Sequence, residues 1–295
     1  MAHDHPHDHS RAFGWSVGLN LLIVVVELGA GLWSGSLALV ADSAHNFGDV
    51  LGLALAWGTT RLARRKSTPR YTYGLRRSSV LAALANALLL LAGTGGLIWE
   101  AVERLRLGAR APGEPAIVIG VALLGMVINA GSAFMFSGHG GDVNLKGAFL
   151  HLLSDALVSL MVVICGVVLY FTGWWRIDPI ATLLVATAIL WSTWGLLKES
   201  LALSLDAVPS QIAPEAVQEY LLSQPGVESL HDLHIWSLST NQTALTVHLV
   251  SPLGLDDAFL GRVCEELEKR FAIGHSTIQV EKSQMHCHCD PHEHH

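Results

Sequence analysis

Charged residues are scarce in this chain of 295 residues, and their scarcity argues against several classes of protein. Asp, Glu, Lys and Arg make up 15% of the sequence, whereas an ordinary soluble domain carries about 25%. Hydrophobic residues reach 51%, which argues against a typical cytosolic enzyme and against a disordered chain. Since the net charge is −7, the chain also lacks the basic excess of a nucleic acid binder, and no nucleic acid partner is expected.

Other common signatures are missing too. The four cysteines, two of them close together near the C-terminal end, do not make a disulfide framework. The first apolar stretch has neither a basic leading region nor a small-residue cleavage site, so we interpret it as a membrane span and not a signal peptide. No His-Glu-x-x-His motif occurs, which argues against a membrane metalloenzyme. We therefore expect no catalytic activity.

Histidine is plentiful instead. Nine of the 16 histidines lie in the first nine and last ten residues, a composition typical of flexible metal-binding tails. Charge is unevenly distributed as well, because residues 206–295 hold 13 acidic and four basic side chains while residues 1–205 are nearly balanced. These shifts predict a His-rich tail over 1–11, a membrane domain over 12–205, a soluble domain over 206–284 and a His/Cys-rich tail over 285–295.

Six apolar blocks make up the membrane domain, and each reaches the roughly 20 residues that a helix needs to cross a bilayer. The blocks cover about 13–33, 38–60, 79–102, 115–137, 145–171 and 178–203. Six spans form an all-α transmembrane bundle with both termini on one side.

Basic residues indicate which side that is, because loops rich in Lys and Arg stay in the cytoplasm. One side carries ten of them: Arg11, Arg61, Arg64, Arg65, Lys66, Arg70, Arg76, Arg77, Lys146 and Lys198. The other side carries four: Arg104, Arg106, Arg110 and Arg176. We therefore expect a multi-pass protein of the inner or plasma membrane with both termini in the cytoplasm.

The soluble domain shows mixed periodicities. Residues 214–223 and 256–271 favour helices, whereas 231–239 and 242–250 alternate like half-buried strands, and 276–282 favours a last strand. The order α-β-β-α-β predicts a small α+β domain of ferredoxin-like type.

Two pairs of ionisable residues lie inside the apolar blocks, where charge is costly and usually functional. His45 and Asp49 belong to the second block, and His151 and Asp155 to the fifth. Each pair has the form His-x-x-x-Asp, which puts both side chains on one helical face. Two such faces turned toward each other supply two imidazoles and two carboxylates, a tetrahedral N/O set that suits Zn²⁺. Asp42, three residues before His45, fits the role of a neighbouring partner better than that of a ligand.

Several motifs in order resemble the cation diffusion facilitator family of metal/proton antiporters. They are SLALVADSAHNFGDV, YTYGLRRSSVLAALANALLLL, HLLSDALVS, the DP at 178–179, HDLHIWSL and HSTIQVE. The resemblance covers about residues 12–284, and the His-x-x-x-Asp form resembles the zinc-type branch. It implies a six-helix transporter, commonly a homodimer, with a cytoplasmic domain.

The resemblance also implies site residues. The transport site would be His45, Asp49, His151 and Asp155. Further metal ligands in the cytoplasmic domain are expected at these positions: His231, His248, His275 and Glu281, with Cys287 and Cys289 as tail ligands. His234, beside Trp236, is expected to have a packing or hydrogen-bonding role. The loop over 61–78 contains neither Asp nor His, so we expect no metal site there.

These residues predict a proton-coupled exporter of Zn²⁺ that works by alternating access in the lipid bilayer. Imidazole binds metal only when it is neutral, so divalent ions and protons compete for the same site. Cd²⁺, Co²⁺ and Ni²⁺ also accept such ligands and stay open as substrates. A passive metal channel and a membrane-bound metal sensor are the alternatives.

Overall fold

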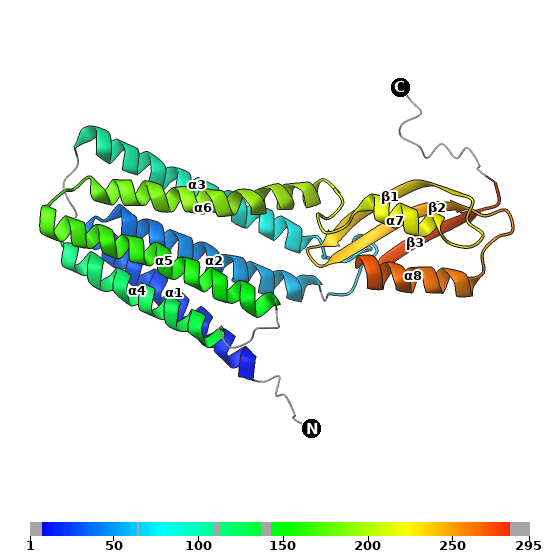
Figure 1. Ribbon diagram of the computed structural model, residues 1–295, viewed down its shortest axis with the longest axis horizontal. Coiled ribbons are helices and arrows are strands. Elements are labelled where there is room, and N and C mark those ends of the chain that lie inside the picture. The colour runs from blue at the N-terminus through cyan, green and yellow to red at the C-terminus, as the bar shows by residue number, and fades with distance from the viewer. Residues whose placement is uncertain (1–7, 64, 109–112, 137–142, 284–295) are drawn as a thin grey trace. The chain divides into compact units, whose positions relative to one another are not determined.

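Long helices occupy the six predicted apolar blocks. A computed structural model of the chain describes residues 8–63, 65–108, 113–136 and 143–283 (Figure 1). The helices are α1 (Asp8–Ser34), α2 (Leu37–Ala63), α3 (Ser78–Leu107), α4 (Pro115–Phe136), α5 (Val143–Thr172) and α6 (Ile177–Ser204). Four of them, α3 to α6, are long and apolar enough to cross a membrane. The prediction of a helical transmembrane domain is confirmed.

The first two helices differ from the other four. The apolar part of α1 within the described side chains is the shorter segment Gly18–Ser34. Helix α2 has 27 residues, but Asp42, His45 and Asp49 lower its hydropathy. Helix α1 begins at Asp8, inside the segment expected to be tail, because no Gly or Pro interrupts the backbone between Asp8 and the first apolar block.

The chain folds into two compact units, one of residues 1–54 and 85–195, the other of residues 55–84 and 196–295. In the first unit, α4 packs along α5 and against α1. Small residues permit the close approach, since a Cβ on Gly166 of α5 would lie 2.7 Å from Cγ1 of Ile119 on α4. Buried Leu39, Val118 and Val162 join α2, α4 and α5 in one apolar cluster.

Large apolar side chains also cover the outside of these helices. Leu22, Leu89 and Trp191 are 57%, 60% and 87% exposed, which in water would be costly over so wide a surface. Trp33 is exposed near the end of α1, where interfacial aromatics occur in membrane proteins. Large apolar side chains on the outside of the helices are what a lipid-facing surface requires.

The second unit contains the small α+β fold. Its elements are α7 (Pro214–Leu222), β1 (Ser229–Ser239), β2 (Gln242–Val250), α8 (Asp257–Phe271) and β3 (His275–Glu281). The α-β-β-α-β order is confirmed, with boundaries within two residues of the predicted ones. The sheet order is β1-β2-β3, with β1 antiparallel and β3 parallel to β2.

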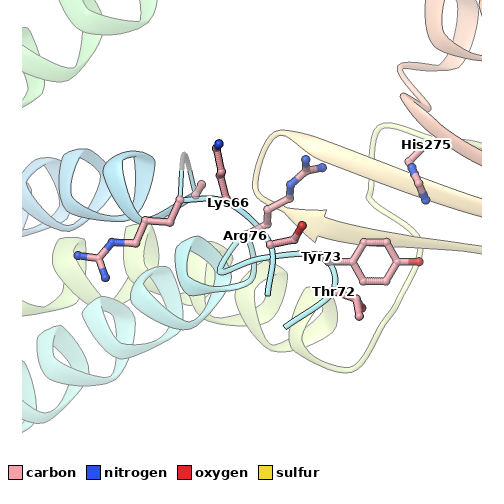
Figure 2. A pocket seen from close by; sticks show the side chains of 8 residues that line it. Lys66, Thr72, Tyr73, Arg76 and His275 are labelled. Atoms are coloured by element: carbon pink, nitrogen blue, oxygen red, sulfur yellow. The ribbon is translucent and has the colours of Figure 1, made fainter. Parts of the chain in front are cut away.

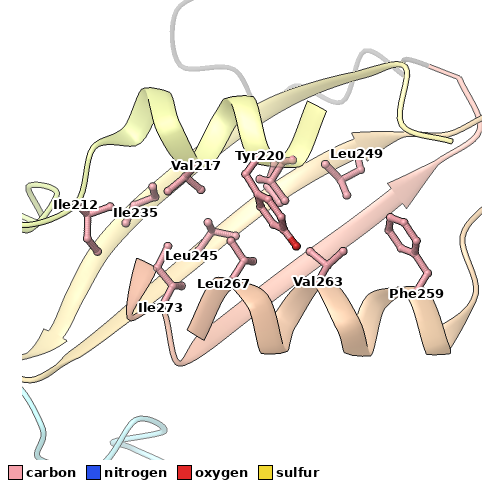
Figure 3. Packing of buried hydrophobic residues seen from close by; sticks show 12 residues of the cluster. Ile212, Val217, Tyr220, Ile235, Leu245, Leu249, Phe259, Val263, Leu267 and Ile273 are labelled. Atoms are coloured by element: carbon pink, nitrogen blue, oxygen red, sulfur yellow. The ribbon is translucent and has the colours of Figure 1, made fainter. Parts of the chain in front are cut away.

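Strand alternation separates the two faces of this sheet. Leu245, Val247 and Leu249 of β2 point toward the side chains of α7 and α8, as Figure 3 shows for Val217, Leu267 and their neighbours. His248 lies between two of these β2 residues and therefore faces the opposite side of the sheet. Helix α8 is anchored at its start by Asp256, whose side chain accepts a hydrogen bond from the backbone N–H of Phe259.

Candidate metal centres

The two His-x-x-x-Asp pairs come together between α2 and α5. His45 Nε2 lies 3.3 Å from Asp155 Oδ1, and His151 Nε2 lies 3.5 Å from Asp49 Oδ2. His151 Nε2 is also 3.6 Å from Asp155 Oδ2, one turn further along its own helix. Each imidazole therefore faces a carboxylate of the other helix, which is the juxtaposition that the i, i+4 spacing predicts.

One ligand atom each from His45, Asp49 and Asp155 falls within 4.8 Å of the others. Exposure is graded across the group, from 2% for the Asp155 side chain through 17% for His45 and 28% for Asp49 to 50% for His151. His151 thus lies at the more open end. We call these four residues the transport site, after the role that the sequence predicts for them.

The donor atoms of the transport site fit a divalent cation. Within the described residues, Asp49 Oδ2 and Asp155 Oδ1 are buried and accept no hydrogen bond. A buried carboxylate oxygen without a donor is costly unless a cation faces it. Two carboxylates cancel a double positive charge, and two imidazoles complete an N/O shell of the kind that zinc accepts.

Buried polar residues lie behind this site. Asp42 is fully buried and accepts a hydrogen bond of 2.8 Å from Ser159 Oγ, which is one turn beyond Asp155 on α5. Glu27 of α1 is also fully buried and accepts from Asn46 Nδ2 at 3.1 Å. Asp42 thus links α2 to α5 through its hydrogen bond with Ser159. The role of Ser159 was not predicted, although its spacing of four from Asp155 is a signal that sequence reading could have used.

The carboxylate of Asp178, which we call the Asp178 clamp, binds the backbone N–H groups at the start of α2. Asp178, at the beginning of α6, is 1% exposed and accepts hydrogen bonds from Ser36 Oγ and from the backbone N–H groups of Leu37 and Ala38. The N–H groups of the first helical turn have no partner within the helix, and a carboxylate there is favoured by the helix dipole. Asp178 therefore fixes the helix that carries His45 and Asp49. The Asp-Pro pair at 178–179 contributed to the family resemblance, but this role of Asp178 was not predicted from the sequence.

A second group of metal-ligating side chains lies on the open face of the sheet. His231 Nε2 is 3.1 Å from Glu281 Oε2, and His248 Nδ1 is 2.9 Å from Glu281 Oε1. One ligand atom from each of these three residues falls within 4.8 Å of the others. They come from β1, β2 and β3, because His231 pairs with His248 and Glu281 pairs with Val250 in the sheet register. We call them the cytoplasmic His–Glu group, after the location that the sequence predicts for this domain.

The hydrogen bond from His231 is the main cause that lowers the pKa of Glu281, and those from His248 and Gln279 add to it. Glu281 is only 7% exposed, and burial by itself would raise its pKa, but the hydrogen bonds outweigh burial and favour the ionised form. An ionised carboxylate beside two imidazoles is a donor set that fits zinc.

A β-bulge brings an unpredicted acid to this group. The register shifts between His231 and His234, so that two residues of β1 oppose one of β2. Asp232 in the bulge has a φ of 53°, a left-handed conformation that Asp tolerates better than most residues. Its carboxylate lies 2.7 Å from His234 Nε2 and 3.7 Å from His248 Nε2. His234 is thus a hydrogen-bonding residue. In the sequence, the stretch HDLH breaks the alternation of polar and apolar residues expected of a strand, and this break could have predicted the bulge.

His275 does not join the cytoplasmic His–Glu group. It begins β3 and pairs with Ala244, whereas Glu281 ends the same strand. Six residues of strand separate the two by about 20 Å. The His275 ring instead packs edge-on against Tyr73, with 5.6 Å between ring centroids. Cys287 and Cys289 lie outside the described residues.

Comparison with known proteins places the chain in one family. Residues 15–203 match the cation efflux transmembrane domain, and residues 209–283 match the cation efflux protein cytoplasmic domain. A metal cation efflux system protein, CzcD of Cupriavidus metallidurans, is 36% identical over 95% of this chain and 89% of its own length. The zinc transporter ZitB of Pectobacterium atrosepticum is 36% identical over 100% and 94%. The cadmium, cobalt and zinc/H(+)-K(+) antiporter of Bacillus subtilis is 30% identical over 96% and 93%.

Proposed function

Because this chain belongs to the cation diffusion facilitator family, also called the cation efflux family, we propose that it exports Zn²⁺ from the cytoplasm in exchange for protons. The observation that carries the proposal is the crossed pairing of His45 with Asp155 and of His151 with Asp49. We assign zinc binding during transport to these four side chains.

The ligand chemistry supports zinc as the substrate. Imidazole nitrogen and carboxylate oxygen suit Zn²⁺, whereas harder cations favour oxygen alone. Cd²⁺, Co²⁺ and Ni²⁺ accept the same donors, and the Bacillus subtilis relative is named for cadmium and cobalt as well as zinc. A broad divalent specificity therefore accompanies the proposal.

Proton coupling follows from the same geometry. A proton on His45 would be stabilised by Asp155, and one on His151 by Asp49, so the carboxylates that hold the metal also hold the protonated imidazoles. Metal and protons then compete for one set of atoms. Zinc binds from the cytoplasm, the bundle opens outward, arriving protons release the ion, and their return drives the next cycle.

We further propose the arrangement of the chain in its membrane. Residues 12–205 form the transmembrane domain and residues 206–284 a cytoplasmic domain through which two copies form a homodimer. Both termini lie in the cytoplasm, since the loops on that side hold most of the basic residues. The membrane is the inner or plasma membrane.

The cytoplasmic His–Glu group is proposed to hold an additional zinc ion. His231 and His248 would supply nitrogen and Glu281 oxygen, with Asp232 orienting His248. His275 would take part only in a separate site, because the sheet register keeps it away from Glu281. The tail residues Cys287 and Cys289 are proposed as weak zinc collectors.

Zinc flux into proteoliposomes tests the transport site. We expect His45→Ala and Asp155→Ala each to abolish flux, because each removes a ligand. Ser154→Ala is the matched control, since its hydroxyl is exposed and donates to the carbonyl of Leu150 in its own helix. Full flux in either ligand variant would refute the assignment.

Two alternatives predict different results in the same vesicles. A passive channel would carry zinc at a rate insensitive to a pH gradient. A membrane-bound sensor would bind zinc but carry none. The sensor is disfavoured because the proposed ligands lie within apolar helices and include buried Asp155, whereas the channel is separated from the exporter by the pH-gradient result.

A further inference from the structure

A cavity in the second compact unit is lined by basic side chains that neither proposed metal centre uses. Its volume is about 420 Å³, within the range of about 300–1,000 Å³ of small-molecule sites. The lining residues are Ala63, Arg65, Lys66, Ser67, Thr72, Tyr73, Arg76 and His275. Seven of them come from the end of α2 and the loop over 65–77, which we call the α2–α3 loop, and one is the first residue of β3.

The α2–α3 loop folds back on itself to form this cavity. The backbone N–H of Gly74 donates to the Tyr71 carbonyl at 2.9 Å, and Tyr71 N–H donates to Thr68 Oγ1 at 3.1 Å. Gly74 has a φ of 73°, and a Cβ added there would lie 3.4 Å from the Arg65 carbonyl. The turn thus brings Gly74 back beside Arg65 at the start of the loop.

Figure 2 shows Lys66 and Arg76 extending to the same side of the loop, while Tyr73 points toward His275. Arg76 is half-buried and Lys66 is exposed. Tyr73 and His275, whose rings are in edge contact, both line the cavity.

Charge in this cavity has one sign. No acidic residue is among the lining residues. Within the part of the chain that the structure describes, Arg65, Lys66 and Arg76 form no ion pair, although the neighbouring Arg77 pairs with Asp206. Arg76 and His275 also line an adjoining cavity of about 650 Å³ that contains Glu268.

We propose that this cavity binds the phosphate group of a small anion or of an anionic lipid. Three cationic side chains and the hydroxyls of Ser67, Thr72 and Tyr73 line the cavity and supply donors of the kind that a phosphate oxyanion accepts. Two sources offer that group: free phosphate in the cytoplasm and the headgroup of a membrane lipid. The α2–α3 loop joins two transmembrane helices, so a lipid headgroup lies within reach.

A bound phosphate would tie the α2–α3 loop to the start of β3. It would therefore connect the ends of two transmembrane helices with the sheet that carries the cytoplasmic His–Glu group. Anion binding would then influence a transporter whose substrate is a cation.

The test uses the full-length protein in a neutral detergent and a metal-free buffer. Binding is measured by isothermal titration calorimetry with three probes: inorganic phosphate, dihexanoyl phosphatidylglycerol and zwitterionic dihexanoyl phosphatidylcholine. We expect phosphate, phosphatidylglycerol or both to bind, and phosphatidylcholine to bind at least about 10-fold more weakly than the better of them. Preference for phosphatidylglycerol identifies a lipid as the source, and equal or better binding of phosphate identifies the free ion.

Two double variants separate a built site from diffuse charge attraction. Lys66→Gln with Arg76→Gln removes two cations from the cavity, and we expect affinity to fall at least about 10-fold. Arg61→Gln with Arg70→Gln is the matched control, since these arginines lie over the rings of Trp57 and Tyr71 outside the cavity lining.

Diffuse attraction depends on the number of charges and would weaken both double variants equally. Equal losses, or no binding of phosphate and phosphatidylglycerol by the unmodified protein, would overturn the proposal. Thermal unfolding checks the fold of both variants. If the first one unfolds, Lys66→Gln alone at its exposed position repeats the comparison, with Arg61→Gln as its control.

Discussion

The proposed transport site and the cytoplasmic His–Glu group draw imidazoles and carboxylates from different kinds of secondary structure. The transport site takes its ligands from two helices, at a spacing of four residues in each. The cytoplasmic group takes one ligand from each of three strands, over a span of 50 residues from His231 to Glu281. Helices can shift or tilt against each other, whereas strands in a sheet are held by shared backbone hydrogen bonds. The first arrangement suits a site that must release its ion, and the second suits one that keeps it.

The largest expected difference between the two sites concerns zinc flux. Replacing a residue that only hydrogen-bonds a metal ligand already lowers metal affinity or activity about 10–100-fold. We therefore expect Asp155→Asn to lower zinc flux at least about 100-fold, and Glu281→Gln to lower it less than about 10-fold. Initial rates of zinc uptake into proteoliposomes measure both. A larger loss from Glu281→Gln would reverse the assignment of the two sites.

Much of the transport site could be predicted from the sequence, because a helix relates residues four apart without any knowledge of the fold. For the strand residues, spacing along the sequence does not show which residues of different strands lie beside each other. The register that pairs His231 with His248 depends on the turn at Asn241 and on the bulge at Asp232. The separation of His275 from Glu281 could have been predicted, since six residues along one strand span about 20 Å. Asp178 was missed because its partners lie 140 to 142 residues earlier in the chain.

The next largest effect is expected at the Asp178 clamp. Asp178→Asn replaces one acceptor oxygen by a donor against the N–H groups that start α2, so about 1.5–3 kcal/mol of stability is lost. Thermal unfolding in detergent measures the loss, and zinc flux should fall with it. Thr187→Val, at an exposed hydroxyl bonded only within α6, serves as control and should unfold at the temperature of the unmodified protein.

A smaller effect is expected at the bulge of the cytoplasmic sheet. Asp232→Asn keeps a residue that tolerates left-handed backbone but removes the charge facing His248, so zinc affinity of the cytoplasmic site should fall about 10-fold. Asp232→Ala loses the same charge and adds backbone strain, so it should also lower the thermal stability of the domain. Zinc titration and thermal unfolding of the full chain, each in an Asp155→Ala background, distinguish the two. Equal stability of both variants would contradict the role given to the backbone.

The pH dependence of the cytoplasmic domain should follow Glu281. Its folded-state pKa is lowered, mainly by the hydrogen bond from His231. The stabilisation is therefore fully present above the unfolded value of about 4.3 and is lost as pH falls through the lower folded value. Hydrogen exchange of β3 between pH 6 and about pH 3 measures this loss. Glu281→Gln should remove the pH-dependent part, and an unchanged profile would contradict the account.

The smallest effect is expected from the tails. Removing residues 1–9 and 286–295 takes away nine histidines but none of the ligands in either site. The zinc concentration for half-maximal flux should rise about 2- to 5-fold, as expected for a loss of local ion concentration, while maximal flux stays the same. Abolished flux would mean that the tails belong to the transport machinery.

Proton flux driven by zinc is the most direct test of the central claim. Liposomes that contain the protein and a pH-sensitive dye are given a zinc gradient, and proton movement is recorded together with zinc uptake. The account predicts that protons leave as zinc enters, that an opposing pH gradient slows zinc uptake, and that Asp155→Ala abolishes both signals. Zinc uptake that moves no protons and ignores the pH gradient would contradict it.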